Sequence, residues 1–292
     1  MAEQFLIGID LGTSATKAAL YRTDGTLIAE ANQEVPLDYP RPGVVEQEND
    51  DFYNSAAFTV KECLRQSQID PRQVAGIAFD SQMAGIGSID EDYRPATRFD
   101  SWLDMRCQPY IEFMNKEAGA LVTRLTGCPP TCDHGPKMLW WKHEQPGDYQ
   151  RIAKFVTPAG YVAGTMAGLK ADQAFMDYTF IHFSGFSDSQ AGAWSTELCS
   201  LLGMDIEKLP HIVEPWQVIG QTTPQAARDF GLARKGVHDP VDVLLAEAVL
   251  GAVLDEALGG INHENALAGG GVFLVEHDDA SRNTRAVKEI RR

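Results

Sequence analysis

The chain has 292 residues and a formal net charge of −16, with a sequence pI near 4.8. A surface this acidic repels phosphate backbones and anionic headgroups, which argues against general binding to nucleic acid or to a membrane surface. It does not exclude a nucleotide, because backbone amides and a few cations can hold an anion locally. The length permits one large domain or two smaller ones.

The cysteines and the N-terminus predict a cytoplasmic protein. The cysteines are sparse and odd in number, and their spacing matches no usual zinc site: Cys63, Cys107, Cys128, Cys132 and Cys199. We therefore expect buried, reduced thiols. The N-terminus does not have the basic region and apolar core of a secretory signal peptide, because Glu3 and Asp10 interrupt the apolar residues there. No run in the sequence reaches the roughly 18 apolar residues that a membrane span needs.

The first 35 residues have the pattern of three strands joined by tight connections. We place the strands at 5–10, 16–22 and 26–35, with Thr-Asp-Gly at 23–25 as the turn between the second and the third. Ala18 and Leu20 fall on one face of the second strand. This segment predicts an antiparallel unit at the start of the chain.

A loop, a helix and a further strand follow. We expect a proline-rich loop at 38–43 and a helix within 45–67, whose apolar residues recur at helical spacing. The residues on that helical face are Phe52, Ala56, Val60, Cys63 and Leu64. Residues 74–83 predict another buried strand, and we expect 84–90 to pair with it.

The middle of the chain is mainly helical. Helices are predicted within 107–127, 137–145 and 158–168, each ending near glycine or proline, and another at 195–203 precedes a short strand at 218–220. Three strands, a helix and a further strand are the element order of a ribonuclease-H-like half. The fold class we expect is therefore α/β, with a mixed five-stranded sheet, flanking helices and a helical insertion.

Residues 241–258 differ from the rest because they are nearly all apolar. They predict a helix that needs partners on several faces. Such a helix indicates self-association into a homo-oligomer, or a surface that another chain covers.

Polar residues follow the first strand in an unusual density. Asp10 ends the strand, and Gly12, Thr13, Ser14 and Lys17 follow within eight residues. Glycine lets backbone amides approach a phosphate, the hydroxyls add donors, and Asp10 can hold Mg²⁺ directly or through water. Lys17 has two interpretations: it is a charge partner within this group, or the alternation of the strand points its side chain outward. A plain hairpin turn uses the same residue types, so this stretch alone leaves both interpretations open.

Six segments match, in order and spacing, the motifs of one enzyme family. Residues 7–25 ("IGIDLGTSATKAALYRTDG") look like its first phosphate motif, and 74–85 ("VAGIAFDSQMAG") resemble its "I-x-G-I-x-x-S-x-Q-M-x-G" motif. Residues 100–107 ("DSWLDMRC") resemble its "W-x-D-x-R" loop. The other matching segments are 43–53, 176–194 and 201–232. The family is the FGGY carbohydrate kinases of the actin-like ATPase superfamily.

In that family the N-terminal domain binds the sugar, and the resemblance implies sugar contacts for six residues here. These are Gln82, Met83, Trp102, Asp104, Arg106 and Asp177. A polyol pocket needs several polar groups and an apolar plate. The indole can stack on C–H faces, the carboxylates and the amide can share hydroxyl hydrogen bonds, and the guanidinium can orient its neighbouring carboxylate or contact the sugar.

Each of these residues also has a purely structural interpretation. Trp102 could fill the core, and Asp104 with Arg106 could form a surface ion pair of little energetic value. Met83 could serve packing alone, and Asp177 could cap a helix. The Gln82 amide is harder to explain in this way, because a buried amide needs partners.

The family's catalytic aspartate has no clear counterpart. In the family it follows a glycine run, whereas Asp239 and Asp242 have no such run before them, and 268–273 ("AGGGVF") has no aspartate after it. Asp242 is the candidate that position alone suggests. The resemblance implies an N-terminal kinase domain over 1–232 and an atypical segment over 233–292, with the family's C-terminal ATPase domain missing.

We expect a member of an ATP-dependent carbohydrate kinase family, xylulokinase-like, that transfers a phosphoryl group to a sugar hydroxyl and is incomplete on its own. ATP and Mg²⁺ are the cofactors, a sugar or polyol is the substrate, and a separate C-terminal ATPase half is the partner that the resemblance implies. The alternative is a non-catalytic sugar-binding or regulatory module derived from such a kinase. Three explanations for the missing ATPase domain stay open: the chain is a fragment, its reading frame is altered after about residue 232, or it is a genuine short protein.

Overall fold

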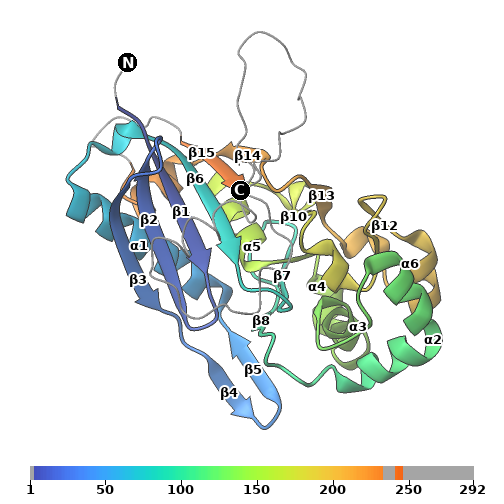
Figure 1. Cartoon of the computed structure of the whole chain (residues 1–292). Coiled ribbons are helices and arrows are strands. Elements are labelled where there is room, and N and C mark those ends of the chain that lie inside the picture. The colour runs from blue at the N-terminus through green and yellow to red at the C-terminus, as the bar shows by residue number, and fades with distance from the viewer. Residues whose placement is uncertain (1–2, 233–240, 246–292) are drawn as a thin grey trace, which may run out of the picture.

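A six-stranded mixed sheet forms the centre of the protein, whose computed structural model describes residues 3–232 and 241–245. The strand order is β14-β15-β6-β1-β2-β3 (Figure 1). The strands are β1 (Phe5–Leu11), β2 (Ala15–Arg22), β3 (Leu27–Glu34), β6 (Val74–Ser81), β14 (Val218–Gln221) and β15 (Asp242–Leu245). β1, β2 and β3 pair antiparallel, whereas β6 runs parallel to both β1 and β15.

The sheet is mixed, as the sequence predicts, but it has six strands and not five, and one of them, β15, lies where we expected a helix. β14 pairs antiparallel with β15 and so extends the sheet at that edge. The three N-terminal strands and the strand at residues 74–81 lie where we expected them.

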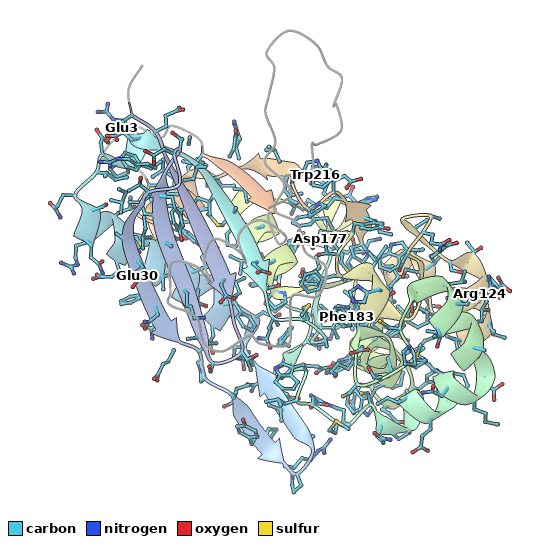
Figure 2. All side chains as sticks on the ribbon, in the orientation of Figure 1. Glu3, Glu30, Arg124, Asp177, Phe183 and Trp216 are labelled. Carbon is cyan, nitrogen blue, oxygen red and sulfur yellow. The ribbon has the colours of Figure 1, made fainter. Side chains whose placement is uncertain are left out.

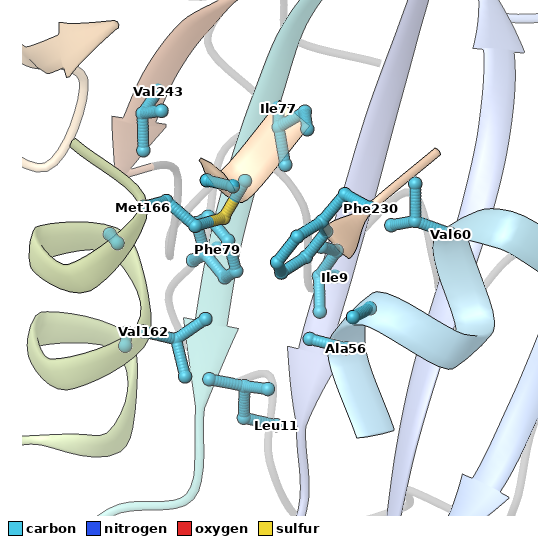
Figure 3. Packing of buried hydrophobic residues seen from close by; sticks show 14 of the residues in the cluster. Ile9, Leu11, Ala56, Val60, Ile77, Phe79, Val162, Met166, Phe230 and Val243 are labelled. Atoms are coloured by element: carbon cyan, nitrogen blue, oxygen red, sulfur yellow. The ribbon is translucent and has the colours of Figure 1, made fainter. Parts of the chain in front are cut away.

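One face of the sheet carries the main hydrophobic core. The helices that contribute to this core are α1 (Asn49–Ser67), α5 (Pro158–Ala167) and α7 (Pro224–Asp229). The face predicted for α1 is confirmed, since all five of its apolar residues are buried in the core cluster. Figure 3 shows side chains of the sheet and of the elements that cover it packed together in this core: Ile9, Leu11, Ala56, Val60, Ile77, Phe79, Val162, Met166, Phe230 and Val243.

A helical insertion with a second core lies beside the sheet (Figure 1). It contains α2 (Gln108–Thr126), α3 (His134–Glu144), α4 (Pro146–Arg151) and α6 (Thr196–Leu202). Its core includes Met114, Trp140, Trp141 and Phe186, all buried. The helices predicted in this region are confirmed, and α4 is an addition.

Short strands and turns connect the two parts. The small strands are β4 (Asp38–Arg41), β5 (Val44–Gln47), β7 (Gly87–Ile89), β8 (Phe99–Asp100), β9 (Lys154–Val156), β10 (Phe175–Asp177), β11 (Ser187–Asp188), β12 (Ala193–Trp194) and β13 (His211–Val213). The 3-10 turns are η1 (Pro71–Gln73), η2 (Ala171–Gln173), η3 (Ile181–Ser184) and η4 (Ile206–Lys208).

Three expectations about these connections are wrong. Residues 38–43 are not a loop, because β4 and β5 form a hairpin there whose second strand pairs with β8. Within 84–90 the strand is β7, and it pairs with β9 and not with the preceding strand. The apolar helix predicted from residue 241 does not begin there, because 242–245 form β15. Residues 246–258 lie outside the described residues.

Candidate functional site

The turn between β1 and β2 is closed by its own backbone. The Gly12 N–H donates to Ala15 O at 3.1 Å, and a Cβ atom at Gly12 would lie 2.8 Å from that oxygen. Glycine is therefore needed here for a close backbone approach. The Gly12 amide, which we expected to approach a phosphate, is engaged within the hairpin. The Ser14 side chain is exposed, and its carbonyl accepts from the Val35 N–H at 2.9 Å.

Two carboxylates lie in register at the carboxyl ends of β1 and β6. Asp10 is opposite Asp80 in the parallel pair, and Lys17 on β2 places Nζ 3.4 Å from Asp10 Oδ2. Lys17 thus points toward Asp10, as in the first of its two interpretations. Asp80 was not among the predicted residues. Its position at a strand end, directly before Ser81 and Gln82, could have identified Asp80 as a candidate from the sequence. Only the parallel register of β1 and β6 shows that Asp80 neighbours Asp10.

Gln82 lies at the centre of a hydrogen-bonded group that we call the Thr13 cluster: Thr13, Gln47, Gln82 and Trp102. The Gln82 side chain donates to Gln47 Oε1 at 3.0 Å and accepts from Thr13 Oγ1 at 3.3 Å. Gln47 Nε2 donates to the Thr13 carbonyl at 3.0 Å. The amide at position 82 therefore has the partners that a buried amide requires, since the residue is only 9% exposed.

Trp102 joins the Thr13 cluster from the loop after β8. Its indole Nε1 donates to Thr13 Oγ1 at 2.9 Å, while 47% of the residue stays exposed. The interpretation of Trp102 as core filler is therefore wrong. The Thr13 hydroxyl, which we expected to face a phosphate, serves to link Gln82 to Trp102. Met83, 56% exposed, lies beside Gln82 in the chain and also does not belong to the core.

The backbone bends sharply just after Gln82. Ala84 has φ 63°, in the left-handed region that side chains other than glycine rarely adopt. At Gly85 a Cβ atom would lie 2.3 Å from the Phe99 ring and 2.8 Å from Asp100 O. Backbone strain of this kind persists where surrounding structure enforces it, and it concentrates at binding and catalytic sites.

A buried ionic network, which we call the Arg106 network, holds the loop that carries Trp102. The Arg106 guanidinium lies 2.7 Å from Glu46, 2.9 Å from Asp100 and 2.9 Å from Asp104, and it stacks over the Trp140 ring at 4.8 Å. Asp104 is fully buried, so Asp104 and Arg106 are not the surface pair of the structural interpretation. The network combines a residue of the 43–53 motif with residues of the 100–107 motif, and nothing in the sequence spacing of these motifs indicates that they meet.

The Asp104 carboxylate is used by the protein itself. It accepts from the Val45 N–H at 2.8 Å, from the Arg106 N–H at 3.0 Å and from Arg106 Nε. The contacts of Asp104 and Arg106 described here are made within the protein, and the sugar contacts that the resemblance implies for them stay a prediction.

We expect Asp100 to make the stability of the fold decline as the pH rises from about 4 to about 7. Burial raises the pKa of Asp100 from 3.8 to about 7, against the opposing effect of Arg106. In this window the folded state binds a proton that the unfolded state has lost, so higher pH favours unfolding. Urea denaturation of the wild type and of Asp100→Asn should show the stability difference shifting steadily in favour of the variant. A difference that stays constant across the window would contradict this.

The hydrogen bonds described for Asp177 and Asp242 do not involve the Thr13 cluster. Asp177, on β10, is buried, and its carboxylate accepts from the N–H and the hydroxyl of Thr179, within its own segment (labelled in Figure 2). Asp242 pairs with Gly76, four residues before Asp80 on β6, and accepts from Gln221 Nε2 at 3.0 Å. A separation of four residues along a strand is roughly 13 Å. The structure therefore does not bring Asp242 to the edge where Asp10 lies, and Asp239 and 268–273 lie outside the described residues.

The described residues, 3–232 and 241–245, contain no group of three or more His, Cys, Asp or Glu side chains placed to hold a metal. The Asp10–Asp80 pair supplies two carboxylates, which suits a cation that keeps several waters and takes its other ligands from a nucleotide. No described helix is both long enough and apolar enough to cross a bilayer.

Comparisons with known proteins cover most of the chain. The model of the FGGY family of carbohydrate kinases, N-terminal domain, matches residues 5–241. A xylulose kinase of Bacillus subtilis (strain 168) is 28% identical over 233 residues, covering 80% of this chain and 46% of that protein. A glycerol kinase of Thermococcus kodakarensis is 24% identical over 221 residues, covering 75% of this chain and 44% of that protein. The chain spans about half the length of the curated relatives it matches.

Solved structures agree on the fold. A gluconate kinase from Lactobacillus acidophilus superposes with a TM-score of 0.75 at 22% identity, covering 84% of this chain and 48% of that one. A ligand-bound xylulose kinase from the same organism gives a TM-score of 0.74 at 22% identity, with the same coverage. These likenesses confirm the α/β fold class that the element order predicts.

Proposed function

Since the chain belongs to the FGGY family of carbohydrate kinases, whose N-terminal domain it carries over residues 5–241, we propose that it is the sugar-binding half of an ATP-dependent sugar kinase. The observation that carries this proposal is the Thr13 cluster. It joins the hairpin of the phosphate motif, the end of β6 and the Trp102 loop at one place. Motifs that are up to 89 residues apart in sequence thus meet through hydrogen bonds.

We assign the sugar-facing surface to the exposed side chains of Trp102 and Met83. The indole is held in place by its bond to Thr13, so its orientation is fixed before a ligand binds. A fixed aromatic plate can stack on the C–H face of a sugar, while Gln82 beside it offers an amide to hydroxyl groups. The Arg106 network supports this surface from behind and is a positioning device.

We assign the cofactor side of the site to the edge where Asp10 and Asp80 lie in register. Mg·ATP, when bound, would supply the transferable phosphoryl group and the cation that neutralises its charge. Asp10 and Asp80 would hold that cation through its waters, and Lys17 would offset the charge of the carboxylates. The backbone N–H groups of Thr13 and Ser14 and the Ser14 hydroxyl would donate to phosphate oxygens.

A pentulose is the substrate class that we propose. The "SQMAG" and "WLD-x-R" segments look more like kinases of pentuloses than of glycerol, and the relatives include xylulose kinases from several bacteria. The second candidate is a sugar-binding module without catalysis. It is favoured by the position of Asp242, which lies far from Asp10 along the sheet.

We expect the isolated chain to show no phosphotransfer above background with ATP, Mg²⁺ and xylulose. The resemblance places the adenosine site in the family's C-terminal ATPase domain, and that domain would have to supply the base as well. A coupled ADP-release assay measures this directly. Addition of a C-terminal kinase half should raise the rate if the chain is catalytic, and leave it unchanged if the chain only binds sugar. Robust turnover by the isolated chain would contradict its incompleteness.

A further inference from the structure

Two thiols lie side by side next to the loop that carries Trp102. Cys107 directly follows Arg106 and is fully buried, whereas Cys132 is partly exposed. Their Sγ atoms are 3.5 Å apart. A disulfide bond needs a sulfur separation of about 2.05 Å, so the two atoms have to approach by about 1.5 Å.

Cys132 has the surroundings of a reactive thiol. Lys137, itself fully buried, places Nζ 3.2 Å from Cys132 Sγ and donates to the Cys132 carbonyl at 2.6 Å. The hydrogen bond from Cys107, together with the Lys137 ammonium, lowers the pKa of Cys132 to about 6, while the same bond and burial raise the pKa of Cys107. A thiolate beside a cation is the form that attacks electrophiles.

We propose that Cys107 and Cys132 form a peroxide-oxidisable thiol pair, in which Cys132 is the attacking sulfur and Cys107 the resolving one. The Cys132 thiolate attacks one oxygen of hydrogen peroxide, the O–O bond breaks, and the released hydroxide takes up a proton to give water. Cys132 is then a sulfenic acid. Cys107 Sγ attacks Cys132 Sγ, the S–O bond breaks, and the hydroxide takes the Cys107 proton. Two thiols lose two electrons, and one peroxide becomes two waters.

Oxidation has a direct route to the Trp102 loop. Cys132 Sγ lies 2.7 Å from the Asp104 carbonyl oxygen, and Asp104 is part of the Arg106 network. Formation of the disulfide draws Cys132 Sγ toward Cys107 and away from the Asp104 carbonyl, to which the loop is anchored. Weaker sugar binding after oxidation follows from this, a consequence that rests on the proposed function.

The modification itself is tested without any sugar. The full chain is treated with hydrogen peroxide, free thiols are blocked with iodoacetamide, and disulfide thiols are then reduced and labelled with N-ethylmaleimide for peptide mass spectrometry. We expect the second label on Cys107 and Cys132 together and on no other cysteine. Cys128→Ser, which removes a partly exposed thiol four residues from Cys132, should leave this pattern unchanged.

The single variants separate the two roles. In Cys107→Ser the oxidation should stop at a sulfenic acid on Cys132 that dimedone traps, and in Cys132→Ser the Cys107 thiol should stay reduced. If a serine at the buried position 107 impairs folding, Cys107→Ala serves the same purpose. Equal labelling before and after peroxide in the wild type, or a disulfide that involves Cys128, would overturn the proposal.

The second readout is sugar affinity of the oxidised and the reduced chain by calorimetry. We expect at least a tenfold weaker affinity after oxidation, restored by a dithiol reductant and absent in Cys132→Ser. Unchanged affinity with a mapped Cys107–Cys132 disulfide would overturn the link to the Trp102 loop. If the reduced chain binds no sugar, the proposed function is refuted, while the mapped disulfide still supports the thiol pair.

Discussion

Replacement of Arg106 by methionine is expected to lower the free energy of unfolding by about 3–5 kcal/mol, because it leaves buried carboxylates without their cation. Arg106 is ion-paired to Glu46, Asp100 and Asp104, and the last two are at most 1% exposed. Methionine keeps much of the side-chain volume, so the loss reports the charge and the hydrogen bonds more than a cavity. Urea denaturation followed by circular dichroism measures it.

Arg65→Met is the matched control for this variant. Arg65 also pairs with a carboxylate, Glu62, but on the exposed surface of α1, where an ion pair adds little. We expect no resolvable change there. Equal effects of the two substitutions would show that the Arg106 network does not hold the fold together. Arg106→Lys should fall between wild type and Arg106→Met, since an ammonium cannot reproduce the fork of the guanidinium.

Replacement of Gly12 by alanine is expected to destabilise the fold by about 1–3 kcal/mol and to weaken sugar binding at least tenfold. The added Cβ would lie 2.8 Å from Ala15 O, a backbone atom that can move only with the whole turn. The turn carries Thr13, which holds both Gln82 and Trp102, so a shift of the hairpin separates these side chains. Thermal unfolding and calorimetric titration with xylulose give the two quantities.

Gly147→Ala controls for the general effect of a methyl group, because nothing lies within 4 Å of a Cβ atom at that position. It should leave stability and affinity unchanged, or raise stability slightly. A Gly12→Ala variant with wild-type affinity would show that the hairpin does not set the geometry of the Thr13 cluster.

Local patterns in the sequence predicted the elements whose signals are local. The three N-terminal strands and the buried face of α1 follow from short-range alternation and from 3.6-residue spacing, and the structure confirms both. The hairpin of β4 and β5 was not predicted, because β4 is exposed along its whole length and has no apolar stripe to reveal it. Prolines and a glycine dominate that stretch.

Long-range pairing accounts for the other differences. β7 pairs with β9, more than 60 residues later, and no feature of 84–90 identifies that partner. The apolar run from residue 241 fits a buried helix and a buried parallel strand equally well, and its partner β6 decides the matter for 242–245.

The candidate site was predicted in part. Gln82 and Trp102 lie together, as motif order led us to expect, and a buried amide had to find partners. The burial of Asp104 could not be read from the "W-x-D-x-R" spacing, because it depends on Glu46 and Asp100 arriving from β5 and β8. Asp177 belongs to β10, and its hydrogen bonds do not reach the cluster.

Sugar binding by the folded chain tests the central claim most directly. Isothermal titration with xylulose, glycerol and gluconate, on wild type, Trp102→Ala and Trp216→Ala, compares two indoles that are 47% and 62% exposed. We expect one of these ligands to bind, Trp102→Ala to bind it at least tenfold more weakly, and Trp216→Ala to bind it like the wild type. A folded wild-type chain that binds none of them, or equal losses in both variants, would contradict a sugar site at the Thr13 cluster.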